Sequence, residues 1–198
     1  MQNDQRAQMI EQLVVDLHRQ HLALLEYVRS HYFGKYRGTV SDNEDETSRG
    51  RLKVTVPAVL GDVEVWAMPS VPYAGSGVGF YSLPPAGAGV WIEFEGGDPS
   101  YAIWSGCFWA DNELPDPAGP DVKIWKTDSL TVRLDDSADE LVIKNSLAAK
   151  TTYGDSVKTE SFASTLTVGV EGVVSEAGIG KLEVTPAVVS VKSGVLVI

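Results

Sequence analysis

The sequence predicts a mainly β protein with an N-terminal helix, a small closed β-barrel, and a C-terminal β-helix or β-prism needle built by three chains. Residues 4–31 contain neither glycine nor proline, which favours an uninterrupted helix within residues 1–31. Residues 32–115 contain short strand-like runs between glycine and proline breaks, as small barrels do. Residues 122–198 alternate apolar and polar residues in short runs, and the proline-rich residues 116–121 separate the two β segments.

The first segment carries an apolar stripe at heptad spacing, interrupted by His21. The stripe covers fewer than three heptads, which is short for a self-sufficient coiled coil. It suits either a bundle formed with copies of the same helix or docking onto a separate hub protein, and both interpretations stay open. We expect His21 to be a core residue rather than a switch. The stripe consists of Ile10, Val14, Leu17, Leu24 and Val28.

The middle segment is expected to form a barrel because its strands are short, close together and bounded by turn residues. Val90, Ile92 and Phe94 alternate with polar or aromatic neighbours, which predicts one face toward a core. The predicted strands are Lys35–Val40, Arg51–Val56, Val63–Met68, Gly79–Ser82, Gly89–Glu95 and Ala102–Phe108.

The C-terminal segment predicts strands that bury one face only. Leu130, Val132 and Leu134 alternate with polar residues, and from Leu166 on the apolar runs recur roughly every 7–9 residues, as in β-solenoids and β-prisms. Such short strands close poorly within one chain. We therefore expect a homotrimer in which three chains wind about a common axis, so that residues 122–198 form an intertwined β-helical spike.

Composition excludes several classes of protein. The formal net charge of −11 argues against a nucleic-acid partner, because phosphates are bound mainly by Lys and Arg. No apolar run is long enough for a membrane helix. Acids within the first 30 residues argue against a secretory signal, so we expect assembly in the cytoplasm. All three histidines precede residue 32, so we expect no histidine-bound ion on the axis of the tail.

Candidate chemical sites are weak, and we expect neither an enzyme nor a cofactor or metal site. Glu93 and Glu95 have the spacing of a carboxylate pair, but two such acids on an exposed strand face are common. Asp42–Glu46 is acidic but lacks the calcium-loop pattern and is expected to be a solvated loop. Cys107 has no histidine nearby in sequence and is expected to be a small buried residue. Gly75–Gly79 lacks the dinucleotide spacing and is expected to be a loop.

Several sequence motifs, in order over about residues 33–145, resemble the OB-fold domain of contractile-tail spike proteins. This family includes phage baseplate assembly protein V, the central spike of tailed phages, and the spike part of VgrG in type VI secretion. The motifs are Phe33–Val40, Arg49–Pro57, Trp66–Gly75, Pro84–Pro99, Trp104–Trp109, Val122–Thr127 and Leu134–Asp136.

The resemblance implies a structural central spike: a trimeric needle beneath a tail tube, driven into a target membrane when a sheath contracts. It also implies a separate hub protein above, because only the helix precedes the barrel, and a PAAR-type tip protein at the other end. No lysozyme-like insert is present, which puts wall degradation in doubt. We predict that Val195, Val197 and Ile198 form or border the tip-binding platform. The particle could be a phage, a tailocin or an extracellular injection system.

Two other interpretations stay open. The protein could be a trimeric OB-fold binding module, or an adhesin-like fibre protein, whose barrel grips a ligand while the tail acts as a stalk. A cell-wall hydrolase would require a carboxylate pair held in a cleft, which the sequence does not indicate.

Overall fold

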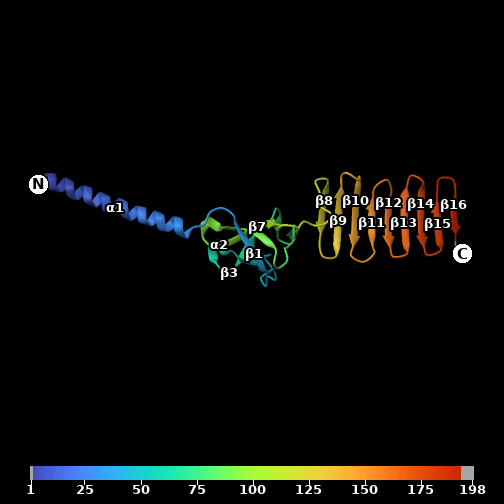
Figure 1. The fold of residues 1–198 in the computed structure, drawn as a ribbon, viewed down its shortest axis with the longest axis horizontal. Coiled ribbons are helices and arrows are strands. Elements are labelled where there is room, and N and C mark those ends of the chain that lie inside the picture. Colours follow the sequence, from blue (N-terminus) through green and yellow to red (C-terminus); the bar gives the residue numbers. More distant parts are fainter. Residues whose placement is uncertain (1, 193–198) are drawn as a thin grey trace. The chain divides into compact units, whose positions relative to one another are not determined.

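The computed structural model describes residues 2–192, which divide into two compact units after Asn112. The first unit contains the N-terminal helix and the barrel, and the second contains a separate β-sheet (Figure 1). Residues 116–121, predicted as a linker, belong to the second unit. Val195, Val197 and Ile198, the predicted tip-binding residues, lie outside the described residues.

Helix α1 runs from Gln2 to Ser30 and is a single helix, as the absence of glycine and proline predicted. It ends where the His31 ring stacks on Tyr27, with 3.9 Å between ring centroids, and the His31 Nδ1 lies 2.9 Å from the Tyr27 carbonyl oxygen. The next residue, Tyr32, donates its backbone N–H to the Gly97 carbonyl at 2.7 Å. This bond begins the connection of the helix to the barrel.

Five strands close the barrel in the order β1-β2-β3-β7-β6. All neighbours are antiparallel except β3 and β7, which run parallel. A short helix, α2 (Pro57–Leu60), follows β2, with Pro57 in the first turn where its missing N–H costs nothing. The barrel strands are β1 (Tyr36–Asp42), β2 (Leu52–Thr55), β3 (Glu64–Pro69), β6 (Gly89–Phe94) and β7 (Ala102–Phe108).

The prediction of a strand at Gly79–Ser82 is wrong. Gly79 ends a two-residue strand, β5 (Val78–Gly79), which pairs with β4 (Ala74–Gly75) in a small separate hairpin. The reason is topological, because the five other strands already pair around the barrel and leave no open edge for a sixth strand.

The barrel core comes from the alternation that the sequence predicted. In β6, Val90, Ile92 and Phe94 are buried, whereas the residues between them are partly exposed. Glu95, however, lies outside the strand in a 3₁₀ turn, so it does not extend the strand face of Glu93. Burying each large aliphatic side chain contributes about 1.5–3 kcal/mol. The largest fully buried side chains are Leu52, Ile92, Val40, Val54, Val56 and Val90.

The second unit is one nine-stranded antiparallel sheet in which strands follow chain order from β8 to β16. From β12 on, strands begin at residues 157, 164, 172, 180 and 189, as the sequence period predicted. The structure contains one chain, and that chain forms an open sheet. The trimeric β-helix or β-prism therefore stays a prediction. The strands are β8 (Val122–Lys126), β9 (Leu130–Asp135), β10 (Glu140–Asn145), β11 (Lys150–Tyr153), β12 (Val157–Ser161), β13 (Ser164–Gly169), β14 (Gly172–Ala177), β15 (Gly180–Val184) and β16 (Val189–Lys192).

Candidate assembly surface

The nine-stranded sheet has one mainly apolar face and one mainly charged face, with buried Val142 beside Arg133 on the charged face and Lys123 beside Leu134 on the apolar face. Successive side chains of a strand point to opposite faces, and the register carries each face from strand to strand. In β13, for example, Leu166 and Val168 point to one face, while Thr165 and Thr167 point to the other. Val168 pairs with Val157 on one side and with Val173 on the other, so the apolar face continues across these strands.

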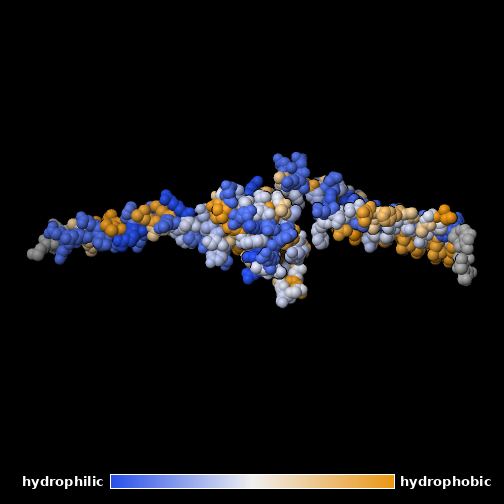
Figure 2. Space-filling model, turned by 90° about the horizontal axis from the view of Figure 1, so that it is seen from below, coloured by the Kyte–Doolittle hydropathy of each residue, from blue (hydrophilic) through white to orange (hydrophobic). Residues whose placement is uncertain are grey.

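The apolar face carries large side chains that are exposed in the single chain. Monomeric proteins rarely expose contiguous apolar patches of more than about a few hundred Å², and larger patches mark interaction sites. Apolar side chains gather along the surface of this sheet in Figure 2. The exposed members of the apolar face are Trp125, Leu130, Leu134, Ile143, Tyr153, Val157, Leu166, Val168, Val173, Leu182, Val184, Val189 and Val191.

The charged face is organised by short ion pairs. The Arg133 Nη2 lies 3.0 Å from the Glu140 Oε2, and the Lys158 Nζ lies 2.7 Å from the Glu160 Oε1. The hydrogen bond from Lys158 lowers the pKa of Glu160, and the hydrogen bond to Glu183 raises the pKa of Lys181. Such solvent-accessible pairs contribute little to stability. They mark the face of the sheet on which the charged side chains gather.

Helix α1 presents a second exposed apolar surface. Its stripe residues Ile10, Val14, Leu17, Leu24 and Val28 are all exposed, so the first unit does not cover them. No helix among the described residues combines the length and apolarity required to cross a bilayer. The exposure of its apolar residues makes the stripe a candidate surface for protein association.

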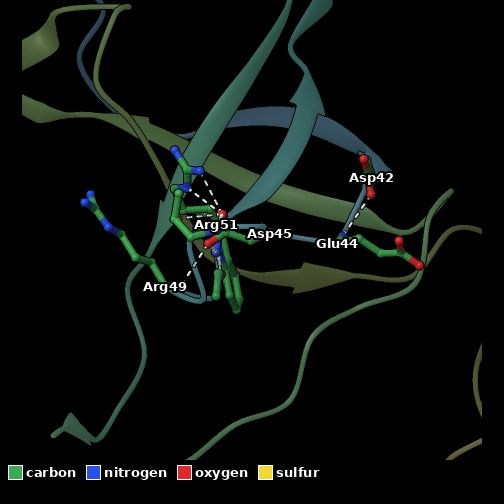
Figure 3. A network of polar contacts seen from close by, with 8 residues as sticks. Asp42, Glu44, Asp45, Arg49 and Arg51 are labelled. Atoms are coloured by element: carbon green, nitrogen blue, oxygen red, sulfur yellow. Dashed lines mark hydrogen bonds and ion pairs between the residues drawn. The ribbon is translucent and has the colours of Figure 1, made fainter.

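The acidic segment of the barrel differs from the solvated loop that the sequence predicted. The Asp45 side chain is only 3% exposed, and its carboxylate accepts hydrogen bonds from Arg51 and Thr47 side chains at 2.7 Å (Figure 3). Its second oxygen accepts the Arg49 N–H at 2.9 Å. The Arg51 guanidinium, which also stacks over Trp66 at 4.9 Å, holds the pKa of Asp45 far below its usual range. Asp45 is thus a structural anchor for the loop between β1 and β2.

The other sequence candidates do not come together as a chemical site. Glu93 pairs with Lys35, which also donates to the Ser105 Oγ at 2.7 Å. Cys107 is exposed, not buried as expected. Desolvation by neighbouring atoms nevertheless raises the pKa of its thiol, which opposes thiolate formation. Among residues 2–192, no three potential ligand side chains are grouped to hold a metal ion.

A hollow of about 390 Å³ lies beside the β4–β5 hairpin. Its wall is largely aromatic and apolar and also includes Arg49, and it is the feature that a ligand-binding barrel would use. The residues that define it include Arg49, Tyr73, Tyr81, Leu83 and Trp104.

The geometry defines a small five-stranded barrel with one parallel pair, the arrangement of an OB barrel, followed by a sheet with an open apolar face. Residues 36–109 match the family model of the type VI secretion system/phage-baseplate injector OB domain, so this part of the chain is similar to that family. The resemblance seen in the sequence motifs is thereby confirmed over these residues. A comparison with curated proteins finds no match.

Sequence reasoning missed two kinds of residue. Asp45 looked like its acidic neighbours, because only the folded loop brings Arg51 onto it. Val170 continues the apolar alternation of Leu166 and Val168 in the sequence, but it lies in the turn after β13 and is 92% exposed.

Proposed function

We propose that the protein is the central spike of a contractile injection apparatus, formed by three chains whose sheets turn their apolar faces inward. The observation that carries the proposal is the exposed apolar face of a sheet that follows an injector OB domain in the same chain. Burying that face removes apolar area from water, which is the main favourable term in association.

The strand pairing favours a prism with one chain in each wall. Each strand from β9 to β15 has both backbone edges paired with its own chain, so those edges are not available to other chains. Copies can then meet through the apolar faces and the sheet margins. Nine strands stacked at about 4.8 Å would give each wall a length of about 40 Å.

The charged face supports the same arrangement. In a closed prism the ion pairs of Arg133, Lys158 and Lys181 would lie outside, where charge keeps a rod soluble. The backbone hydrogen bonds of the walls would run along the axis and resist axial load. These properties suit a needle that is pushed through an envelope.

The remaining parts of the proposal come from the resemblance. A separate hub protein would bind above the barrels, and a PAAR-type tip protein would bind near Val195, Val197 and Ile198. The particle would be a phage tail, a tailocin or an extracellular or type VI-like system. Contact with a target membrane would be mechanical, and neither catalysis nor a cofactor is invoked.

Light scattering after size-exclusion chromatography tests the trimer. We expect the full chain to have three times its 21.3 kDa chain mass. Val168→Lys places a charge on the apolar face and should yield single chains, because an unpaired charge is costly to bury. Thr167→Lys, one residue away on the charged face, is the matched control and should leave the trimer intact.

The opposite result would favour the second candidate function. If the full chain and both variants have the mass of one chain, the needle is excluded. The hollow lined by Tyr73, Tyr81 and Trp104 would then make a ligand-binding barrel the better interpretation.

A further inference from the structure

The two long edges of the nine-stranded sheet differ in their hairpins. Hairpins of an antiparallel meander alternate between the two edges, so every second hairpin lies on the same edge. On one edge, here named the tip edge, three successive hairpins each end in one large, exposed apolar residue. These residues are Leu147 between β10 and β11, Phe162 between β12 and β13, and Ile179 between β14 and β15, which are 81%, 87% and 93% exposed.

The tip residues are not explained by the needs of the turns. Phe162 has φ of +47°, a left-handed conformation that is a genuine outlier for a bulky residue. Glycine or asparagine would make this turn with less strain. Because strained backbone and exposed aromatic area both carry a cost, a contact outside the chain would account for a phenylalanine here.

The hairpins also hold these residues in place. The Asn145 side-chain oxygen accepts the N–H groups of Leu147 and Ala149, each at 3.0 Å, which shapes the first hairpin. The Gly178 N–H donates to the Ala163 carbonyl at 3.3 Å, which joins the second and third hairpins side by side. The Phe162 and Ile179 hairpins are therefore joined to each other, and the Leu147 hairpin is held by its own side-chain bonds.

The opposite edge of the apolar face, here named the receiving edge, has the complementary shape. Between its hairpins, pairs of apolar residues lie directly across from each other on neighbouring strands. The pairs are Leu141 with Tyr153, Val157 with Val168, and Val173 with Val184. On the tip edge the same face carries small residues instead: Ser161, Ser164, Ala177 and Gly180.

We propose that the tip edge of one chain packs onto the receiving edge of the next copy, and that this contact forms each corner of the trimer. The inference rests on the proposed three-walled spike. A three-fold rotation about the axis of the spike leaves each strand at the same position along that axis in all three copies. This position along the axis is called the height of the strand. The tip of the β12–β13 hairpin then faces the gap between the β11–β12 and β13–β14 hairpins of its neighbour.

The geometry assigns each tip its own pair of residues in the neighbouring copy. Phe162 meets Val157 and Val168, Leu147 meets Leu141 and Tyr153, and Ile179 meets Val173 and Val184. Each contact joins two different edges, so the interface is head-to-tail and closes as a ring. The row of tips also sets the relative height of the chains.

Cysteine cross-linking tests this pairing in the full chain. Cys107→Ser first removes the one native cysteine. Phe162→Cys with Val157→Cys should then form covalent three-chain species on oxidation, seen on a non-reducing denaturing gel. A bond within one chain is excluded, because the two positions lie at opposite ends of β12, roughly 16 Å apart, and a disulfide requires Cα atoms closer than about 7 Å.

The matched control is Ile179→Cys with Val157→Cys. These positions differ in height by about 12 Å in a symmetric ring, so we expect no covalent trimer. As a second readout, Phe162→Ser should lower the melting temperature of the trimer, whereas Val63→Ser, at an exposed valine of the barrel unit, should not.

The outcomes separate this inference from the proposed function. If light scattering gives three chains but the Phe162–Val157 pair does not cross-link, or the control pair cross-links equally well, the corner pairing is wrong and the spike stands. Equal melting temperatures for the two serine variants would also overturn it. If light scattering gives one chain, the proposed spike itself fails.

Discussion

Asp45 and Glu46 are neighbouring acids with different surroundings. The Asp45 carboxylate is enclosed by Arg51, Thr47 and the backbone of the β1–β2 loop, whereas Glu46 is exposed. The Arg51 bond to Asp45 is charge-assisted, the stronger class of hydrogen bond. Composition cannot distinguish these two residues, because both belong to one acidic segment. The contact to Arg51 exists only after the loop folds back onto β2.

We predict that Asp45→Asn lowers the melting temperature of the protein by several degrees, because it leaves Arg51 without its anion. The folded-state pKa of Asp45 is depressed, so its contribution is fully present above the unfolded pKa of about 3.9. The contribution is lost as the pH falls from there through the folded pKa. Thermal unfolding should therefore show a difference between wild type and variant that is constant from pH 5 to 7, a window set by that pKa, and that shrinks in stronger acid.

Glu46→Gln is the control for this prediction. The Glu46 side chain does not belong to the Asp45 cluster, so we expect the Glu46→Gln variant to have wild-type stability at every pH. Equal effects of the two variants would show that the cluster does not anchor the loop.

At the scale of elements, the sequence left open which partner binds the apolar stripe of helix α1. Heptad assignment places Val14, His21 and Val28 at one core position and Ile10, Leu17 and Leu24 at the other. In a parallel arrangement, Arg6 of one helix would flank Glu11 of the next copy, an opposite-charge pair that favours this register. Valine and leucine at these positions are also common in two-stranded coils, so the sheet, not the helix, would set the number of chains.

We expect α1 to associate with its own copies in the assembled protein. In a Cys107→Ser background, Leu17→Cys should cross-link between chains, because core positions of parallel helices face each other. Arg19→Cys, which faces away from the stripe, is the matched control and should stay uncross-linked. An intact trimer without cross-linking at position 17 would instead make α1 the docking helix for a hub.

The β elements show where local pattern was sufficient and where it was not. Alternation in β6 and β9 correctly predicted which residues share a face, because side chains of a strand alternate whatever surrounds it. The run Gly79–Ser82 has strand-like composition, but the closed barrel has no edge for it. Pairing partners are a property of the whole sheet, which a local pattern does not contain.

At the scale of the whole molecule, each unit has its own architecture, and within residues 2–192 only the barrel encloses a cluster of buried apolar residues. Buried apolar residues of the first unit form one cluster inside the five strands. In the second unit, by contrast, large apolar residues remain exposed on one face. The barrel is therefore expected to be stable as a single chain, and the sheet to depend on association.

A chain that ends at residue 121 tests this division. We predict that it gives the mass of one chain by light scattering at micromolar concentration, since the α1 stripe is too short to associate strongly alone. Its barrel should still unfold cooperatively on heating. A truncated chain with three times its expected mass would place the trimer contacts in α1 or the barrel, not in the sheet.

The sequence by itself determined the features that depend on neighbours along the chain. It predicted the uninterrupted helix, the short barrel strands, the alternating tail and the motifs shared with injector OB domains, because periodicity, breakers and motifs are local. The tertiary structure decided which strands pair, that Asp45 is an anchor rather than a solvated acid, and that Leu147, Phe162 and Ile179 share one edge. These features join residues through hairpin topology and strand register, which become defined only when the whole sheet forms.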